Sequence, residues 1–311
     1  MEQPDYSTHQ LGAFGDHNIQ IHLWTPVAEP TAIIQVFHGL GEHSARYQRF
    51  AQVATDKGYV VCVHDHRGHG PGTEMLGFFA EEIGWDLLVD DAHKVSDFLR
   101  ERYPGRPIVL LGHSMGSYIA QSYARRFGED LAALVLSGST WPSRALLFVG
   151  RILARCEKWR HGIRYRSPLL NKIGFEEYNK KFAPGRTELD WLSRDPDEVD
   201  QYISDPLCGG PYTTGLWWDL LGGLKEISRI DALRSIPASL PVLITGGADD
   251  PVGGAKGMLK LADAYERSGH EKVDKAIYAD GRHEMLNETN RDEFTADLLG
   301  WIENALGNHQ L

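Results

Sequence analysis

The stretch Gly112-His113-Ser114-Met115-Gly116 is the part of this 311-residue chain that most decides its fold. The apolar run Ile108–Leu111 precedes it, and the segment Tyr118–Ala124 follows it. A buried strand, a glycine-flanked turn and a helix are what this order of segments predicts. Only small neighbours tolerate the crowded backbone of such a turn. We therefore expect Ser114 at the apex, with its hydroxyl clear of the sheet.

The pentapeptide alone is a weak signal, because a chain with 33 glycines can contain Gly-x-Ser-x-Gly as an ordinary turn. The strand before it and the helix after it favour the catalytic interpretation. A serine hydroxyl is a poor nucleophile at neutral pH and needs a base, an acid that orients the base, and donors for the oxyanion. Where this turn carries a nucleophile, the chain order is serine, then acid, then histidine.

The acid is predicted at the end of the apolar run Pro241–Thr245, which leads into Gly246-Gly247-Ala248-Asp249-Asp250-Pro251. Carboxylates that follow a strand of a parallel sheet lie at the edge where such sites form. Pro251 biases Asp250 toward extended backbone, so we favour Asp250, with Asp249 as the alternative.

The base is predicted to be His283, in the loop after the apolar segment Lys275–Tyr278. An imidazole titrates near neutrality, so it can take the serine proton and return it to the leaving group. The oxyanion donors are predicted to be the backbone N–H groups of Met115 and of Leu40, in the glycine-rich loop after the strand 32–37.

These motifs together resemble the monoacylglycerol lipase and lysophospholipase branch of the α/β-hydrolases. The resemblance rests on His38–Tyr47, Asp65–Gly70, Gly112–Gly116 and the loops of Asp250 and His283, in that order. It implies a serine hydrolase that cleaves lipid esters, most closely monoacylglycerols, through an acyl-enzyme and without a cofactor. It also implies that Glu42 and Arg46 lie near the polar end of the substrate. Residues 71–74 depart from the usual pattern of relatives.

Composition restricts the class of partner. The net charge of −11 argues against a nucleic-acid partner. Three cysteines without paired spacing fit a reducing compartment, and the first six residues lack the basic and apolar regions of a signal peptide. We expect a cytoplasmic protein whose substrate is a lipid ester; the oligomeric state is left open.

The order of segments predicts an α/β fold with a mostly parallel sheet covered on both faces. We expect strands near 19–24, 32–37, 59–63, 107–111, 133–136, 241–245 and 275–278. Residues 139–224 contain no clear strand and are predicted to be a helical cap, between core segments 1–138 and 225–311. Its tryptophans either form a small core of the cap or line an acyl pocket. The five are Trp141, Trp159, Trp191, Trp217 and Trp218.

Residues 144–186 contain 11 Lys or Arg and 3 Asp or Glu. A helix beginning near Pro142 would place Arg144, Arg151, Arg155 and Lys158 on one side and the apolar residues 146–153 over a broad surface. Such a helix either contacts an anionic membrane peripherally or is a structural lid with a solvated basic edge.

Three other interpretations remain. The run His64-Asp65-His66-Arg67-Gly68-His69 is superficially similar to a zinc motif, but Gly68 stands where an acid is required, so we expect no metal. A lysophospholipase, a general carboxylesterase or a thioesterase would use the same triad, as would a haloperoxidase or a C–C hydrolase of the same fold. An inactive lipid-binding module is the non-enzymatic alternative.

Overall fold

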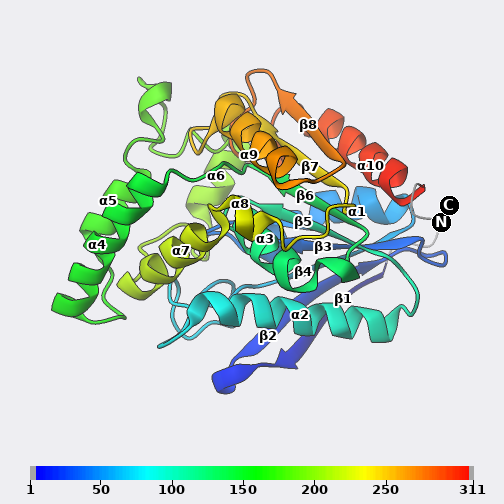
Figure 1. Ribbon diagram of the computed structural model, residues 1–311, viewed down its shortest axis with the longest axis horizontal. Helices are drawn as coiled ribbons and strands as arrows, with labels where there is room; N and C mark the ends of the chain where they lie inside the picture. The colour runs from blue at the N-terminus through cyan, green and yellow to red at the C-terminus, as the bar shows by residue number, and fades with distance from the viewer. Residues whose placement is uncertain (1–4, 308–311) are drawn as a thin grey trace.

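Eight strands of the described residues, 5–307 of this computed structural model, form one sheet (Figure 1). Its order is β1-β2-β4-β3-β5-β6-β7-β8. β3 to β8 run parallel to one another, whereas β2 is antiparallel to both β1 and β4. The strands are β1 (Asp5–Gly12), β2 (Asn18–Thr25), β3 (Ala32–Phe37), β4 (Tyr59–His64), β5 (Ile108–His113), β6 (Ala133–Ser137), β7 (Val242–Gly247) and β8 (Val273–Tyr278).

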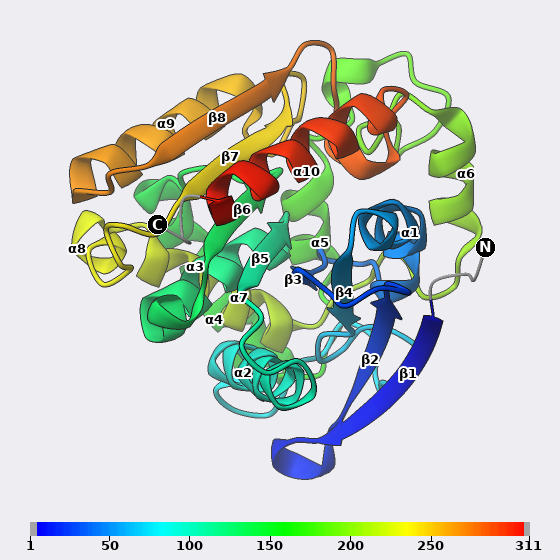
Figure 2. The same cartoon turned by 90° about the vertical axis from the view of Figure 1, so that its right-hand side faces the viewer.

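Helices cover both faces of the sheet because its central strands are apolar on both sides. Ile33 and Leu110 face one cluster of buried residues, which includes side chains of α2, α3 and α9. Ile34 and Val109 face the other, which includes side chains of α1 and α10. Figure 2 shows the helices α1 and α10 on one side of the sheet and α2 and α3 on the other. The mostly parallel, doubly covered sheet predicted from the sequence is confirmed. These helices are α1 (Gln48–Asp56), α2 (Gly84–Arg102), α3 (Met115–Phe127), α9 (Gly254–Ser268) and α10 (Arg291–Gly307).

The sequence prediction missed β1. This strand pairs with β2 along its whole length, from Asp5 opposite Thr25 to Gly12 opposite Asn18. Its side chains are mostly exposed or half-buried, so it carries no apolar run. β1 is held at the edge of the sheet by backbone hydrogen bonds, which leave little trace in a hydrophobic pattern.

The order in which strands are added to the sheet changes side at β3. The strand after β3 in the chain, β4, lies on one side of it, whereas β5 lies on the other side and is followed outward by β6. The loops after β3 and β5 therefore diverge at their carboxyl ends, which is where open parallel sheets form a crevice. These two loops contain Leu40 and Ser114.

The segment between β6 and β7 is helical, and its helices α4 to α7 lie toward the carboxyl end of the strands (Figure 1). The first helix begins at Arg144, two residues after the predicted Pro142. We propose that residues 139–224 act as a cap over this edge. The helices of the segment are α4 (Arg144–His161), α5 (Pro168–Phe175), α6 (Pro196–Ser204), α7 (Thr214–Ile227) and α8 (Ile230–Leu233).

Short 3-10 helices complete the chain: η1 (Phe14–Asp16), η2 (Ser44–Tyr47), η3 (Gly128–Asp130), η4 (Lys180–Phe182) and η5 (Met285–Asn287). Within residues 5–307, every helix is too short or too polar to cross a bilayer.

Candidate active site

Ser114 lies at a strained turn between β5 and α3. Its backbone has φ 50° and ψ −120°, a region that non-glycine residues rarely adopt. The Ser114 N–H donates to the carbonyl of Ser137 on β6 at 2.9 Å, which fixes the turn to the sheet. A Cβ at position 116 would collide with the carbonyl oxygen of Phe37, so glycine is required there. The strand, turn and helix predicted around Ser114 are therefore present.

Asp250 and His283 are in contact, although they follow different strands. The Oδ1 atom of Asp250 lies 3.0 Å from Nδ1 of His283, and both side chains are almost completely buried. Asp249 instead points to the surface, where its Oδ1 accepts a hydrogen bond from Lys181 Nζ at 2.6 Å. Of the two acids that the sequence left open, the structure places Asp250 against the histidine.

The surroundings of His283 adjust its proton affinity in two opposing ways. Burial lowers the pKa of the imidazole, and the charge of the adjacent Asp250 carboxylate raises it. The effect of the carboxylates on the pKa exceeds that of burial. Asp250 contributes most, Glu284 and Glu42 contribute less, and the pKa of His283 is raised above 6.5. The ring of His113 lies 4.8 Å from that of His283, centroid to centroid. Burial and the nearby His283 charge lower the pKa of His113, which favours its neutral form.

Both residues predicted to supply the oxyanion donors line the same hollow as Ser114. Leu40 and Met115 both line a cavity of about 700 Å³ that Ser114 and His283 also line. Within the described part of the chain, neither of the two N–H groups donates a hydrogen bond to another protein atom. Buried backbone donors are nearly always paired. Two unpaired donors beside the serine are thus suited to bind an anionic oxygen.

Histidines support the loop that carries Leu40. His38 Nδ1 lies 2.8 Å from the carbonyl of Gly39, and its Nε2 accepts from the N–H of His66 at 3.0 Å. His69 Nε2 accepts from the N–H of Gly41 at 3.2 Å, and its Nδ1 lies 3.0 Å from the Arg67 carbonyl. The ring nitrogens of His38 and His69 therefore hold backbone groups in place. This positioning accounts for His69 in the run that is superficially similar to a zinc motif.

A possible metal-binding geometry occurs elsewhere. Within residues 5–307, the donor atoms of His43, Asp205 and Cys208 lie within 4.8 Å of one another. His43 Nε2 is 2.7 Å from Asp205 Oδ2, and this contact joins the loop after β3 to the segment after α6. His43 and Asp205 therefore already have each other as partners, and their contact links the core to the cap.

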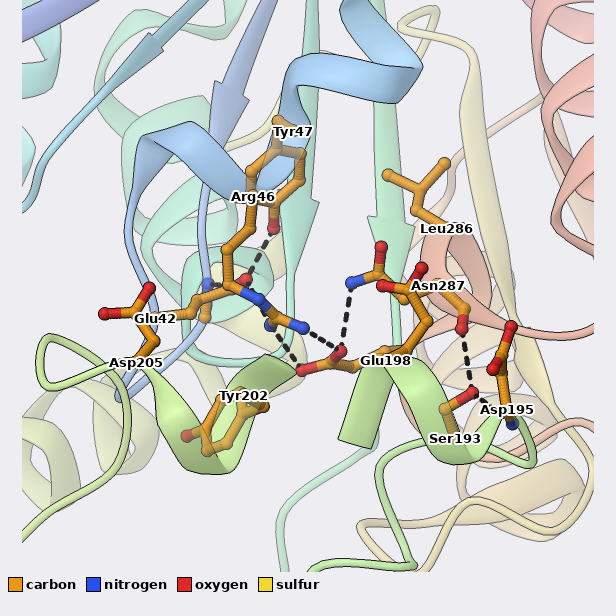
Figure 3. Close-up of polar contacts among 12 residues, drawn as sticks. Glu42, Arg46, Tyr47, Ser193, Asp195, Glu198, Tyr202, Asp205, Leu286 and Asn287 are labelled. Carbon is orange, nitrogen blue, oxygen red and sulfur yellow. Dashed lines mark hydrogen bonds and ion pairs between the residues drawn. The ribbon is translucent and has the colours of Figure 1, made fainter. Parts of the chain in front are cut away.

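Glu42 and Arg46 form part of a buried ion-pair network. Oε1 of Glu42 accepts from the Gly39 N–H at 2.5 Å and from the Tyr47 hydroxyl at 2.9 Å. Arg46 donates to Oε2 of Glu42 at 3.2 Å, and its guanidinium lies 4.9 Å from the ring centroid of Tyr202. Figure 3 shows Glu42, Arg46 and Tyr47 gathered together, with Tyr202 facing them from α6.

Glu284 completes this network and was not singled out from the sequence. Both of its carboxylate oxygens accept from Arg46, each at 2.7 Å, and Oε2 also accepts from Asn287 at 3.0 Å. Burial raises the pKa of Glu284, but the Arg46 guanidinium outweighs it and holds that pKa below its usual value. Its position directly after His283 was the available signal. Glu42 and Glu284 line the large cavity, whereas Arg46 lies behind them.

Helices of the cap supply most of the apolar wall of the cavity. Trp141, Trp191 and Trp217 line it, so some tryptophans of this segment do form a pocket. Trp159 is 86% exposed, and Trp218 lies outside this cavity. Other apolar lining residues are Leu146, Leu147, Leu153, Leu170, Ile173, Phe175, Leu220, Leu221 and Leu224. An apolar cavity with a serine on its wall is suited to an apolar ligand.

Comparisons with known proteins identify a family and several relatives of this chain. The model of the family described as serine aminopeptidase S33 (Hydrolase_4) matches residues 28–290. The monoacylglycerol lipase of Mycolicibacterium smegmatis is 28% identical over 96% of this chain and 98% of its own length. The human monoglyceride lipase is 30% identical over 84% of this chain and 79% of its own length.

Solved structures show the same fold. A thermostable carboxyl esterase from Bacillus coagulans, in complex with glycerol, has a TM-score of 0.90 at 26% identity. The alignment covers 96% of this chain and 98% of the esterase. The resemblance inferred from the motifs is confirmed: the chain belongs to the serine aminopeptidase S33 family of α/β-hydrolases.

Proposed function

We propose that this protein is a serine hydrolase that cleaves carboxylic esters of lipids, most closely monoacylglycerols. The observation that carries the proposal is the cavity of about 700 Å³, which has an apolar wall and both Ser114 and His283 on its surface. Relatives named monoacylglycerol lipase or monoglyceride lipase, from a bacterium and from human, support the same substrate class.

In the proposed reaction, Ser114 attacks the ester carbonyl carbon. His283 accepts the serine proton at Nε2, while Asp250 holds Nδ1 and stabilises the imidazolium. The N–H groups of Leu40 and Met115 bind the oxyanion of the tetrahedral intermediate. The carbon–oxygen bond to the alcohol then breaks, and His283 returns its proton to the leaving oxygen. An acyl group remains on Ser114.

Water completes the cycle. His283 takes a proton from a water molecule as its oxygen attacks the acyl carbon, and then protonates Ser114 as the carboxylic acid leaves. No cofactor is needed for either half-reaction. The acyl chain is held among the apolar side chains of α4, α5 and α7.

The polar end of the substrate is proposed to lie on the side of Glu42. Its carboxylate is on the cavity wall, where it can face an alcohol group. Arg46, the second residue implied by the family resemblance, is held behind that wall by two carboxylates. We therefore propose that Arg46 positions Glu42 and Glu284 and does not touch the substrate.

A panel of soluble and lipid esters tests the proposal. We expect hydrolysis of p-nitrophenyl esters of graded length, and a preference for monoacylglycerols over di- and triacylglycerols. Labelling by a fluorophosphonate probe should accompany the activity. Faster turnover of lysophospholipids would favour the lysophospholipase alternative. Faster turnover of thioesters would favour the thioesterase alternative. A folded protein that the probe fails to label would favour the inactive lipid-binding module.

A further inference from the structure

A second hollow lies between α4 and α7, next to the cavity lined by Ser114, which we call the acyl cavity; the two share Leu147. Its volume is about 660 Å³. Three of its cations come from α4 and one from α7, and its lining contains no aspartate or glutamate. The aromatic and aliphatic part includes Trp218, Phe148 and Ile152. We call this hollow the cap groove; its cationic residues are Arg144, Arg151, Arg155 and Lys225.

The four cations of the cap groove form no ion pair with another described residue. Within residues 5–307, no carboxylate oxygen lies within 4.0 Å of the charged nitrogens of Arg144, Arg151, Arg155 or Lys225. The neighbouring Glu226 is engaged elsewhere, 3.7 Å from Arg125 on α3. Arg151 and Lys225 also line the neighbouring hollow, where Asp86, Asp219 and Glu226 are the acidic residues. The lining of the cap groove itself has four cations and no carboxylate, so an anion that enters it lowers the repulsion among these cations.

Arg151 is already placed for such a ligand. Its guanidinium lies 4.2 Å from the ring centroid of Trp218, a cation–π distance. A Cβ at position 222 would lie 2.8 Å from its Nη1 atom, so the side chain rests against α7. A guanidinium held in one orientation loses less entropy when it binds a phosphate or carboxylate through two parallel hydrogen bonds.

Apolar side chains beside the cap groove are exposed. Phe148 is 68% and Ile152 48% exposed, and the same helix exposes Leu146 (74%) and Val149 (54%). A helix with cations next to exposed apolar side chains can lie in the interface of a bilayer, where both find suitable surroundings. The two features on α4 thus point to the same kind of partner.

We propose that the cap groove binds the phosphate of an anionic phospholipid headgroup and so seats the cap on a bilayer. The inference rests on the proposed lipid-ester function for its purpose, since docking would bring the acyl cavity to the membrane that contains the substrate. The sequence had placed Lys158 fourth in this set of cations. In the structure Lys158 lies outside the lining of the groove, and Lys225 of α7 takes that place.

The test is sedimentation of the full chain with vesicles. Phosphatidylcholine vesicles are compared with mixed phosphatidylcholine and phosphatidylglycerol vesicles at low and physiological salt. We expect binding to the mixed vesicles that weakens with salt, because screening shortens to about 8 Å at physiological ionic strength. A triple variant, Arg144→Gln, Arg155→Gln and Lys225→Gln, should bind about 100-fold more weakly, at about fivefold for each cation near an anionic surface.

A matched variant removes the same charge elsewhere: Lys256→Gln, Lys260→Gln and Lys272→Gln, all exposed residues outside the cap groove. It should keep nearly all binding, and both variants should keep their thermal transition and their turnover of a short soluble ester.

Equal binding to neutral vesicles, or an equal loss in both triple variants, overturns the proposal. So does tight binding of free glycerol phosphate without vesicle binding. If the short ester is not hydrolysed by any form, the proposed catalytic function fails while the vesicle result still decides the groove.

Discussion

Arg46 and Glu284, which are 238 residues apart in the sequence, form a two-point ion pair, with each nitrogen–oxygen distance at 2.7 Å. The pair joins the segment after β3, which carries the proposed oxyanion donor Leu40, to the loop after β8, which carries His283. Two parallel hydrogen bonds between planar groups fix orientation as well as distance. The relative positions of two halves of the proposed catalytic machinery therefore depend on this contact.

The first prediction tests that dependence through stability. Arg46→Met should lower the free energy of unfolding by about 3–5 kcal/mol, because it leaves the buried carboxylates Glu42 and Glu284 without their shared cation. Glu284→Gln should cost less, because Arg46 keeps Glu42 as a partner. Denaturant titration of both variants measures the difference. A larger loss in Glu284→Gln would contradict the shared role of Arg46.

The second prediction concerns the nucleophile. Ser114→Ala should leave a folded protein, because the substitution removes only the hydroxyl group and does not require the backbone to change. Hydrolysis should fall by several orders of magnitude; loss of the nucleophile in a comparable serine triad costs about 10⁶ in turnover. Steady-state kinetics and fluorophosphonate labelling check this. Activity within about tenfold of the parent protein would remove Ser114 from the mechanism.

The third prediction uses two adjacent acids as a matched pair. Asp250→Asn should reduce turnover by about 10⁴, as loss of the orienting acid does in the serine-protease example. Asp249→Asn should have little effect, since Asp249 is paired with Lys181 at the surface. Comparing kcat of the two variants on one soluble ester measures the contrast. If Asp249→Asn were the more damaging, the carboxylate beside His283 would not be the acid that matters.

The fourth prediction concerns pH. His283 must be neutral to accept the serine proton, so activity should rise with pH through its pKa. Because the carboxylates around the ring raise that pKa, the midpoint of the acid limb of kcat/KM should lie above 6.5. Replacing Asp250 by Asn removes the largest raising influence, so burial should then shift the midpoint of the residual activity downward. Asp249→Asn should leave the midpoint where it was.

Local patterns in the sequence were sufficient for the central sheet and the turn of Ser114. β3, β5, β6 and β7 are mainly apolar, and burial on both faces is the physical reason for such a composition. The turn needs small residues at positions that are close in sequence to the serine. β1 was missed because an exposed edge strand is held by backbone hydrogen bonds, which impose no apolar pattern.

The sequence by itself predicted the order of the proposed serine, acid and histidine, since that order follows from which strands precede them. Only the tertiary structure showed that Asp250, and not Asp249, lies against His283, because two adjacent carboxylates differ only in what the fold brings to each. It also decided that Arg46 meets Glu284 and that Lys225, not Lys158, joins the cap groove. Such contacts depend on the packing of segments far apart in the chain, and no local pattern of residues encodes which distant charges will meet.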